Sequence, residues 1–253
     1  MSTPAEARQQ IEVRQLAERA ELEEAVRLQK VIWGFDDIEL LPVRLFVVAS
    51  KIGGHVFAAF DGSRMVGFCM AIPGLKAGGV TYLHSHMLGV LADYNNLGIG
   101  RLLKLAQRED ALARGIPLIE WTFDPLEIKN AYFNMERLGA IVRRYVENQY
   151  GTTTSPLHGG LPTDRCIAEW WVGSERASRV LAREPFERGE IVDRIAVPAD
   201  IAKIRRHDAK ATREIQKSIG ERFQRHFANG LAVIGFERTP DAGVYVIGKA
   251  ELR

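Results

Sequence analysis

The chain of 253 residues is poor in cysteine, in long apolar runs and in net charge. Its two cysteines, Cys69 and Cys166, stand outside any CxxC pair, which argues against a disulfide scaffold, a thioredoxin motif and a metal site. No apolar run approaches the roughly 20 residues of a membrane-spanning helix. The first residues are polar and lack the apolar segment of a signal peptide. We expect a soluble, cytoplasmic protein with reduced thiols, a single disulfide being the alternative.

The balance of charge is close to neutral, with 34 basic and 32 acidic residues and a net charge of +2. This excess is too small to indicate nucleic acid as a partner. The most basic stretch, residues 203–217, is interleaved with acidic residues and is typical of a solvated helix face, with nucleic-acid binding as the alternative. Because 46% of the residues are hydrophobic, a sizeable core can form. We expect neither nucleic acid nor a membrane as a partner.

Hydrophobic periodicity predicts a mixed α/β (α+β) fold. Strands are expected over residues 11–17, 55–60, 65–72, 81–90, 118–123, 140–146 and 166–172. Helices are expected over residues 19–33, 42–50, 98–114 and 126–138. Antiparallel hairpins come early and helical crossovers come late, so we expect a mixed, mostly antiparallel sheet with helices on both faces.

The composition shifts after about residue 175 and predicts a C-terminal β-α-β-β appendage. Its strands are expected over residues 191–198, 231–237 and 244–250, with one helix over 199–228. We therefore divide the chain into a main domain, 1–183, and an appendage, 184–253. The appendage is too small to form a sufficient hydrophobic core of its own. It should therefore pack on the main domain or on the second subunit of a homodimer.

The segment after the fourth expected strand carries the clearest chemical signal. A short loop follows the strand, and Gly98 and Gly100 then open a helix. Unpaired amides at a helix N-terminus bind phosphate oxygens, and glycine lets a ligand approach the backbone closely. The alternative is a tight turn that binds nothing.

This segment resembles the GNAT superfamily of acyl-CoA-dependent N-acyltransferases, whose signature is Gln/Arg-x-x-Gly-x-Gly/Ala. The matching residues are Asn95-Asn96-Leu97-Gly98-Ile99-Gly100, with Asn95 in place of Gln or Arg. The order of elements from about residue 11 to 173 is also similar. The resemblance implies a GNAT-like fold with acetyl-CoA or another acyl-CoA as co-substrate and no metal. It implies that the CoA pyrophosphate binds at Leu97, Gly98, Ile99, Gly100 and Arg101.

The resemblance also implies sites for the rest of CoA. The backbone of Leu88, Gly89 and Val90 would bind the pantetheine arm in a gap beside the strand over 118–123. Asn130 and Asn134 are one helical turn apart, so we expect them to share a face and to bind the CoA arm or the substrate, with solvent exposure as the alternative.

Three residues are candidates for the general base. His84 and His86 share one face of their strand at period two, and imidazole accepts a proton near neutral pH. Glu120 on the next strand is the third candidate. Structural histidines are the alternative reading, and no further Cys or His cluster supports a metal site.

The acid and the substrate-binding residues are less clearly marked. Met135 stands where the resemblance places a tyrosine acid, so that role would pass to Tyr132, Tyr150 or a water molecule. Tyr150 and Arg165 lie in or beside a long loop and are candidates for substrate binding, with a surface or domain contact as the alternative.

Together these signals predict direct N-acyl transfer from CoA to a small-molecule amine such as an amino acid. Acetyl is the expected acyl group and succinyl the alternative. A non-catalytic module that binds CoA or a partner is the alternative function.

Overall fold

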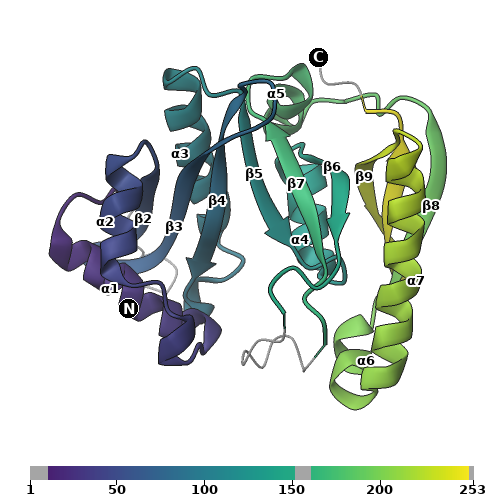
Figure 1. Ribbon diagram of the computed structural model, residues 1–253, viewed down its shortest axis with the longest axis horizontal. Helices are drawn as coiled ribbons and strands as arrows, with labels where there is room; N and C mark the ends of the chain where they lie inside the picture. Colours follow the sequence, from purple (N-terminus) through teal and green to yellow (C-terminus); the bar gives the residue numbers. More distant parts are fainter. Residues whose placement is uncertain (1–10, 152–160, 251–253) are drawn as a thin grey trace, which may run out of the picture. The chain divides into compact units, whose positions relative to one another are not determined.

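The computed structural model describes residues 11–151 and 161–250, and these belong to two compact units, 1–119 and 120–253 (Figure 1). The division falls within strand β5 (Leu118–Phe123). The division of the sequence at residue 184 therefore remains a prediction about folding, separate from these units. Each unit is described by itself.

Unit 1 contains four strands in the order β1-β2-β3-β4, all antiparallel to their neighbours. The strands are β1 (Glu12–Gln15), β2 (His55–Asp61), β3 (Arg64–Leu75) and β4 (Thr81–Val90). The helices are α1 (Arg19–Trp33), α2 (Val43–Lys51) and α3 (Ile99–Ala113), with short 3-10 turns at η1 (Asp37–Glu39) and η2 (Ala92–Tyr94). These bounds agree with the sequence predictions to within a few residues.

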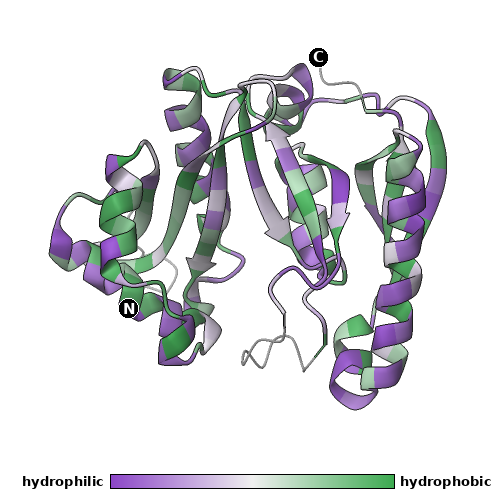
Figure 2. Cartoon of the chain, viewed as in Figure 1, coloured by the Kyte–Doolittle hydropathy of each residue, from purple (hydrophilic) through white to green (hydrophobic). Residues whose placement is uncertain are grey.

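Helices cover both faces of the unit 1 sheet. A Cβ atom on Gly89 would lie 2.8 Å from the Trp33 ring of α1, whereas Leu88 faces Gly100 of α3. Since successive residues of a strand point to opposite faces, α1 and α3 lie on opposite sides of β4. The core contains Leu28, Phe46 and Phe68, none of which is exposed to solvent. Helices such as α1 carry both hydrophobic and hydrophilic segments (Figure 2), as expected for helices with one buried side.

Strand β4 is interrupted by a bulge. Met70 of β3 pairs with Met87 and Ala71 pairs with Ser85, so His86 is an extra residue on β4. A bulge locally disrupts the ladder and bends the strand. The bulged residue is thus one of the two candidate histidines, and His84 lies two residues before it.

Unit 2 contains six strands in the order β5-β7-β6-β9-β10-β8. The further strands are β6 (Ile141–Val146), β7 (Arg165–Trp171), β8 (Ile191–Pro198), β9 (Ala232–Arg238) and β10 (Ala242–Gly248). Pairing of β6 with β7 and β9, and of β10 with β8 and β9, is antiparallel. Its helices are α4 (Ile128–Tyr132), the π-helical turn η3 (Phe133–Arg137), α5 (Glu175–Ala182), α6 (Ile201–His207) and α7 (Ala209–Ala228).

The predicted mixed fold with a mostly antiparallel sheet is confirmed, but two helical predictions were incomplete and one helix was missed. The helix expected over 126–138 is α4 followed by the π-helical turn. The helix expected over 199–228 divides at Asp208, whose non-helical backbone ends α6 and whose side chain accepts a hydrogen bond from the Ala211 amide. Helix α5 was missed, although Ser174 caps it by accepting from the Ala177 amide.

Residues 184–250 continue the unit 2 sheet. Val142 of β6 pairs with Val233 of β9, and β10 and β8 follow outward. Arg176 of α5 donates to the carbonyl oxygen of Ile234, and the Tyr245 hydroxyl donates to that of Pro125. An aromatic cluster surrounds Tyr245, whose ring centroid lies 5.0 Å from that of Phe223 and 4.8 Å from that of Phe236.

Candidate active site

The glycine-rich loop leaves a set of backbone amides without acceptors. Gly98 has φ +82° and ψ 0°, a left-handed conformation, and precedes the first turn of α3. The amides of Arg101 and Leu102 both donate to the Gly98 carbonyl oxygen, at 2.9 and 3.1 Å. Within the described residues, the amides from Leu97 to Gly100 have no acceptor. The Arg101 amide is engaged inside the turn, and its side chain adds a positive charge to this end of the helix. Whether Arg101 binds phosphate stays a prediction.

The space in front of these amides is open. A Cβ atom on Gly98 would meet no heavy atom within 4 Å, and the first turn of α3 contains no acidic residue. Ile99 is buried and anchors the helix, whereas Asn95, Asn96 and Leu97 are exposed. The Asn95 amide donates to Ala92, so its side chain is the part left for a ligand. Open amides at the positive end of a helix favour a bound anion.

The candidate histidines lie side by side on β4. The rings of His84 and His86 have centroids 5.8 Å apart, with His84 half-buried and His86 exposed. Ser85 between them is buried and points toward α3, where its hydroxyl donates to Gln107 Oε1 at 2.9 Å and accepts from Lys104 Nζ at 2.9 Å. Hydrogen bonds from Ser85 to two side chains of α3 therefore hold the segment that carries both histidines. Their role as bases stays a prediction.

A buried hydrogen-bonded chain continues from Ser85 and was missed in the sequence. Gln107 Nε2 contacts His55 Nε2 at 3.0 Å, and His55 Nδ1 contacts Asp110 Oδ2 at 2.7 Å. If Gln107 donates, His55 is neutral and donates to Asp110, and burial does lower the His55 pKa. Burial also lowers the pKa of Lys104 to about 7. Lys104, Gln107 and Asp110 recur every three residues on α3, a spacing that could have revealed a shared polar side.

Leu88, Gly89 and Val90 pair along one edge of β4 with Cys69, Phe68 and Gly67 of β3. Gly89 is buried against α1, and Leu88 and Val90 are half-buried. Their predicted contacts with a pantetheine arm would use the other edge of the strand. Those contacts, and the gap expected beside residues 118–123, remain predictions.

Glu120 is held in an ion pair. Its side chain is buried and Arg144 donates to it, while Arg144 Nε lies 3.5 Å from Glu169 Oε1. Arg143 also pairs with Glu169. To act as a base, Glu120 would have to leave the Arg144 guanidinium, so the geometry favours the histidines.

The two predicted asparagines do not share an environment. Asn130 is exposed, but Asn134 is only 3% exposed. The reason is the π-helical turn, whose wider winding changes the angular relation between residues four apart. Asn134 Oδ1 accepts from Trp121 Nε1 at 3.2 Å, and its buried Nδ2 has no partner in the described residues. Such an orphaned donor costs free energy unless a ligand or water accepts from it.

The candidate acids differ in exposure and in their contacts. Met135 is 1% exposed and contains no acid. The Tyr150 hydroxyl lies 2.9 Å from Thr122 Oγ1 on β5, and its side chain remains exposed. The Arg165 guanidinium stacks 5.5 Å from the Tyr150 ring centroid. Tyr132 instead lies beneath the Arg238 guanidinium, at 5.2 Å.

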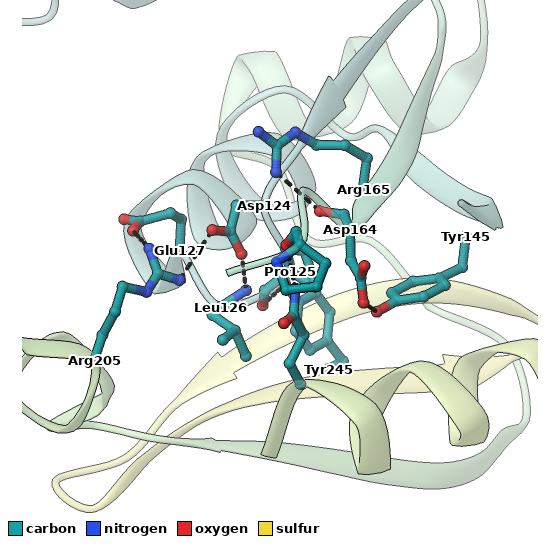
Figure 3. A network of polar contacts seen from close by, with 11 residues as sticks. Asp124, Pro125, Leu126, Glu127, Tyr145, Asp164, Arg165, Arg205 and Tyr245 are labelled. Atoms are coloured by element: carbon teal, nitrogen blue, oxygen red, sulfur yellow. Dashed lines mark hydrogen bonds and ion pairs between the residues drawn. The ribbon is translucent and has the colours of Figure 1, made fainter. Parts of the chain in front are cut away.

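Arg165 is more buried than a free surface cation. It is 8% exposed, and its Nη1 donates to the Asp164 carbonyl oxygen at 2.9 Å (Figure 3). Burial lowers the pKa of Arg165, yet arginine keeps its charge in proteins. Arg165 and Tyr150 thus lie together, as a substrate-binding pair requires, although their role stays a prediction.

The loop after β5 is fixed by residues from α6 and β10 (Figure 3). Asp124 accepts from the Leu126 amide at 2.8 Å and from Arg205 Nη2 at 2.9 Å. The Tyr245 hydroxyl donates to the Pro125 carbonyl oxygen at 2.6 Å. The Asp124 side chain thus caps the turn that follows β5 by accepting from a backbone amide two residues later. Arg205 and Tyr245 are 81 and 120 residues away from their partners in this loop, so no local sequence pattern predicts these contacts.

In residues 11–151 and 161–250, no three His, Cys, Asp or Glu side chains are grouped so as to hold a metal ion. No helix in that part of the chain combines the length and apolarity required to cross a membrane.

Comparison with known proteins identifies the fold. No family model matches the sequence. No curated protein matches it either. A putative acetyltransferase of the GNAT family from Desulfovibrio desulfuricans has a similar structure, with 16% identity, 65% of this chain and 100% of that chain covered, and a TM-score of 0.52.

Two further solved structures agree. Arabidopsis thaliana NAA60, in complex with a bisubstrate analogue, is 18% identical, with 64% and 98% of the two chains covered and a TM-score of 0.51. The ribosomal-protein-S18-alanine N-acetyltransferase from Escherichia coli is 17% identical, with 64% and 94% covered and a TM-score of 0.50. The chain therefore has the fold of GNAT acetyltransferases, which confirms the fold predicted from the resemblance.

Proposed function

We propose that this protein is an acyl-CoA-dependent N-acyltransferase. The observation that carries the proposal is the N-terminus of α3, where the amides are open and the first turn contains no acidic residue. The residues present fit the CoA pyrophosphate, because Leu97, Gly98, Ile99 and Gly100 offer donors and Gly98 leaves the approach clear. Arg101 adds positive charge beside them.

The arm of CoA would lie along Leu88, Gly89 and Val90. Asn134 is a further proposed contact of CoA or of the substrate, because its buried Nδ2 has no acceptor in the described residues. Asn130, which is exposed, would contact a ligand from the surface. CoA supplies the thioester that an amine can attack, and the acyl group is proposed to be acetyl, with succinyl as the alternative.

The chemistry we infer is direct attack. His84 or His86 removes a proton from the ammonium group of the acceptor, and the free amine attacks the thioester carbonyl. Backbone N–H groups stabilise the oxyanion, and Tyr150 protonates the departing thiolate. Burial raises the pKa of the Cys69 thiol to about 12 and that of Cys166 well above its usual range. Both thiols therefore stay protonated, which supports a route without a cysteine-bound intermediate.

The acceptor is proposed to be a small-molecule amine such as an amino acid. Tyr150 and Arg165 support a carboxylate-bearing acceptor, because an arginine beside an exposed phenol suits a carboxylate. A cytoplasmic location and a homodimer belong to the same proposal. Because the similar Escherichia coli protein is a ribosomal-protein-S18-alanine N-acetyltransferase, protein N-termini belong in the substrate panel.

A thiol-release assay tests the proposal. The full chain is incubated with acetyl-CoA or succinyl-CoA and a panel of amino acids, polyamines and peptides, and free CoA is detected with a thiol reagent. Both cysteines of the protein are buried, which keeps the background low. Binding of CoA without release for any amine would support the alternative, a non-catalytic module, in line with buried Met135 at the expected acid position.

Gly98→Glu tests the loop itself. The variant adds bulk and negative charge in front of the open amides, so CoA affinity should fall by at least about tenfold. Gly115→Glu is the matched control, because Gly115 follows the same helix, also has a left-handed backbone with φ +67°, and also has open space around it. Unchanged CoA affinity in a folded Gly98→Glu protein would remove the assignment of this loop.

A further inference from the structure

Unit 2 contains a small cavity separate from every residue assigned to acyl transfer. Its volume is about 90 Å³, and it opens between α5, the segment before β8, and the end of the chain after β10. Its lining combines apolar residues, Ile141 and Ile234, with the cations Arg176, Arg188 and Lys249. Phe186 forms an aromatic wall.

Arg176 is the central cation. It is 6% exposed, its Nε donates to the Gly139 carbonyl oxygen at 2.9 Å, and its Nη2 donates to the Ile234 carbonyl oxygen at 2.6 Å. Its guanidinium lies 5.0 Å from the Phe186 ring centroid. Within the described residues, Nη1 has no acceptor and the guanidinium has no ion-pair partner. One edge of a buried cation is thus left for a ligand.

The other two cations have carboxylates of their own. Arg188 Nη2 donates to Glu136 Oε2 at 2.6 Å, and Lys249 Nζ lies 3.5 Å from Glu190 Oε2. Glu187, the acidic residue of the lining, is exposed and forms no ion pair with Arg176 in the described part of the chain. Arg176 is therefore the lining cation whose charge is not matched by a contacting carboxylate.

Burial of such a charge carries an energetic cost. Moving an unpaired ion out of water costs several kcal/mol, even after the protein relaxes. Burial lowers the pKa of Arg176 to about 10, which still leaves the group charged at neutral pH. Two backbone carbonyls and the negative charge of nearby Glu136 offset part of that cost, and an anion on Nη1 would offset more.

We propose that this cavity binds a small monocarboxylate, with its oxygens on Nη1 of Arg176 and its hydrocarbon part against Ile141, Ile234 and Phe186. A volume of about 90 Å³ equals that of about three water molecules in the liquid, which suits acetate to butyrate. The apolar walls favour a ligand with a short hydrocarbon chain. Inorganic phosphate suits the site less well, because it has no hydrocarbon part to lie against Ile141, Ile234 and Phe186.

Titration calorimetry on the full chain tests the proposal, with acetate, propionate, butyrate and inorganic phosphate at constant ionic strength. We expect one saturable site for butyrate or propionate, and weaker binding of acetate and phosphate. Ala250→Leu adds bulk at the lining and leaves the Arg176 hydrogen bonds in place, so it should weaken butyrate binding by at least about tenfold. Arg179→Met is the matched control, because Arg179 is an exposed arginine of the same helix outside the lining, and its loss should leave affinity unchanged.

Three results would overturn the inference. Absence of saturable carboxylate binding by the folded protein would show that the cavity holds only water. Tighter binding of phosphate than of butyrate would contradict the ligand class. Unchanged butyrate affinity in a folded Ala250→Leu protein would place the binding outside this cavity. None of these results affects CoA binding or thiol release. This inference is therefore tested independently of the proposed acyltransferase activity.

Discussion

Lys104 lies where lysine is seldom found, 3% exposed beneath β4. Its Nζ donates to Ser85, and burial lowers its pKa from 10.5 to about 7. In the unfolded chain the same amine titrates near its ordinary pKa of about 10.4. Between pH 7 and about 10 the unfolded state therefore binds more protons, so the free energy of unfolding rises with pH across this window.

The first prediction concerns this slope. At about 1.36 kcal/mol for each pKa unit, the shift corresponds to a few kcal/mol that is lost again as pH falls toward 7. Lys104→Met removes the titrating group, so the rise in stability from pH 7 to 10 should flatten. Urea unfolding at intervals of pH measures it, with Lys51→Met, an exposed lysine of unit 1, as control. Equal slopes in Lys104→Met and the unchanged protein would contradict the prediction.

The second prediction concerns the base and rests on the proposed acyl transfer. His84→Ala should lower kcat/KM by roughly 10²-fold and alter the acid limb of the pH profile, because a positioned imidazole contributes about that much to proton transfer. His86→Ala is the matched variant, since its ring centroid lies 5.8 Å from that of His84. Losses below about threefold in both would pass the role to Glu120 or to a water molecule.

At the scale of secondary structure, long-range contacts decide where the charged helix divides. Arg205 of α6 donates to Asp124 and Glu127, at 2.9 and 3.1 Å, and this pairing holds α6 against the loop after β5. The chain then turns at Asp208, and α7 begins with a capped amide. A helix of this composition has no internal proline to stop it, so the break reflects tertiary contacts.

The third prediction concerns that cap. Asp208 Oδ1 accepts from the Ala211 amide at 2.8 Å, so Asp208→Ala should lower the free energy of unfolding by about 1 kcal/mol. Asp208→Asn keeps an acceptor oxygen and should stay close to the original stability. Urea unfolding followed by circular dichroism measures both. If the alanine variant is as stable as the asparagine variant, the side-chain cap contributes nothing.

At the scale of the whole molecule, residues 184–250 are joined to the rest of unit 2 by main-chain pairing and buried side chains. Val142 pairs with Val233, and Arg188 Nη2 donates to Glu136. Tyr245 is fully buried and its hydroxyl bonds to Pro125. The match to the Desulfovibrio desulfuricans structure covers all of that protein but 65% of this chain, which leaves room for such an addition.

The fourth prediction concerns removal of this part. A chain ending at Arg183 would expose the β6 edge and the apolar partners of Tyr245, so it should be insoluble or unfold at lower urea concentration. Solubility, unfolding and thiol release of the truncated chain measure the effect. A soluble, monomeric and fully active 1–183 fragment would make residues 184–253 an independent module.

Local sequence determined most strands and helices and the position of the glycine-rich loop, because periodicity, turn residues and a left-handed glycine act over a few neighbouring residues. It also suggested the fold class, through the order of the elements. It failed at the π-helical turn after α4, the break at Asp208 and the bulge at His86.

Tertiary structure alone decided which polar groups are buried and paired. Glu120 became an ion-paired residue through Arg144, Lys104 a buried amine beneath Ser85, and Arg176 a cation with one open edge. The partners in these pairs lie 19 to 58 residues apart along the chain. No local pattern encodes such pairs, because the desolvation and hydrogen bonding that set their chemistry arise only when distant segments meet.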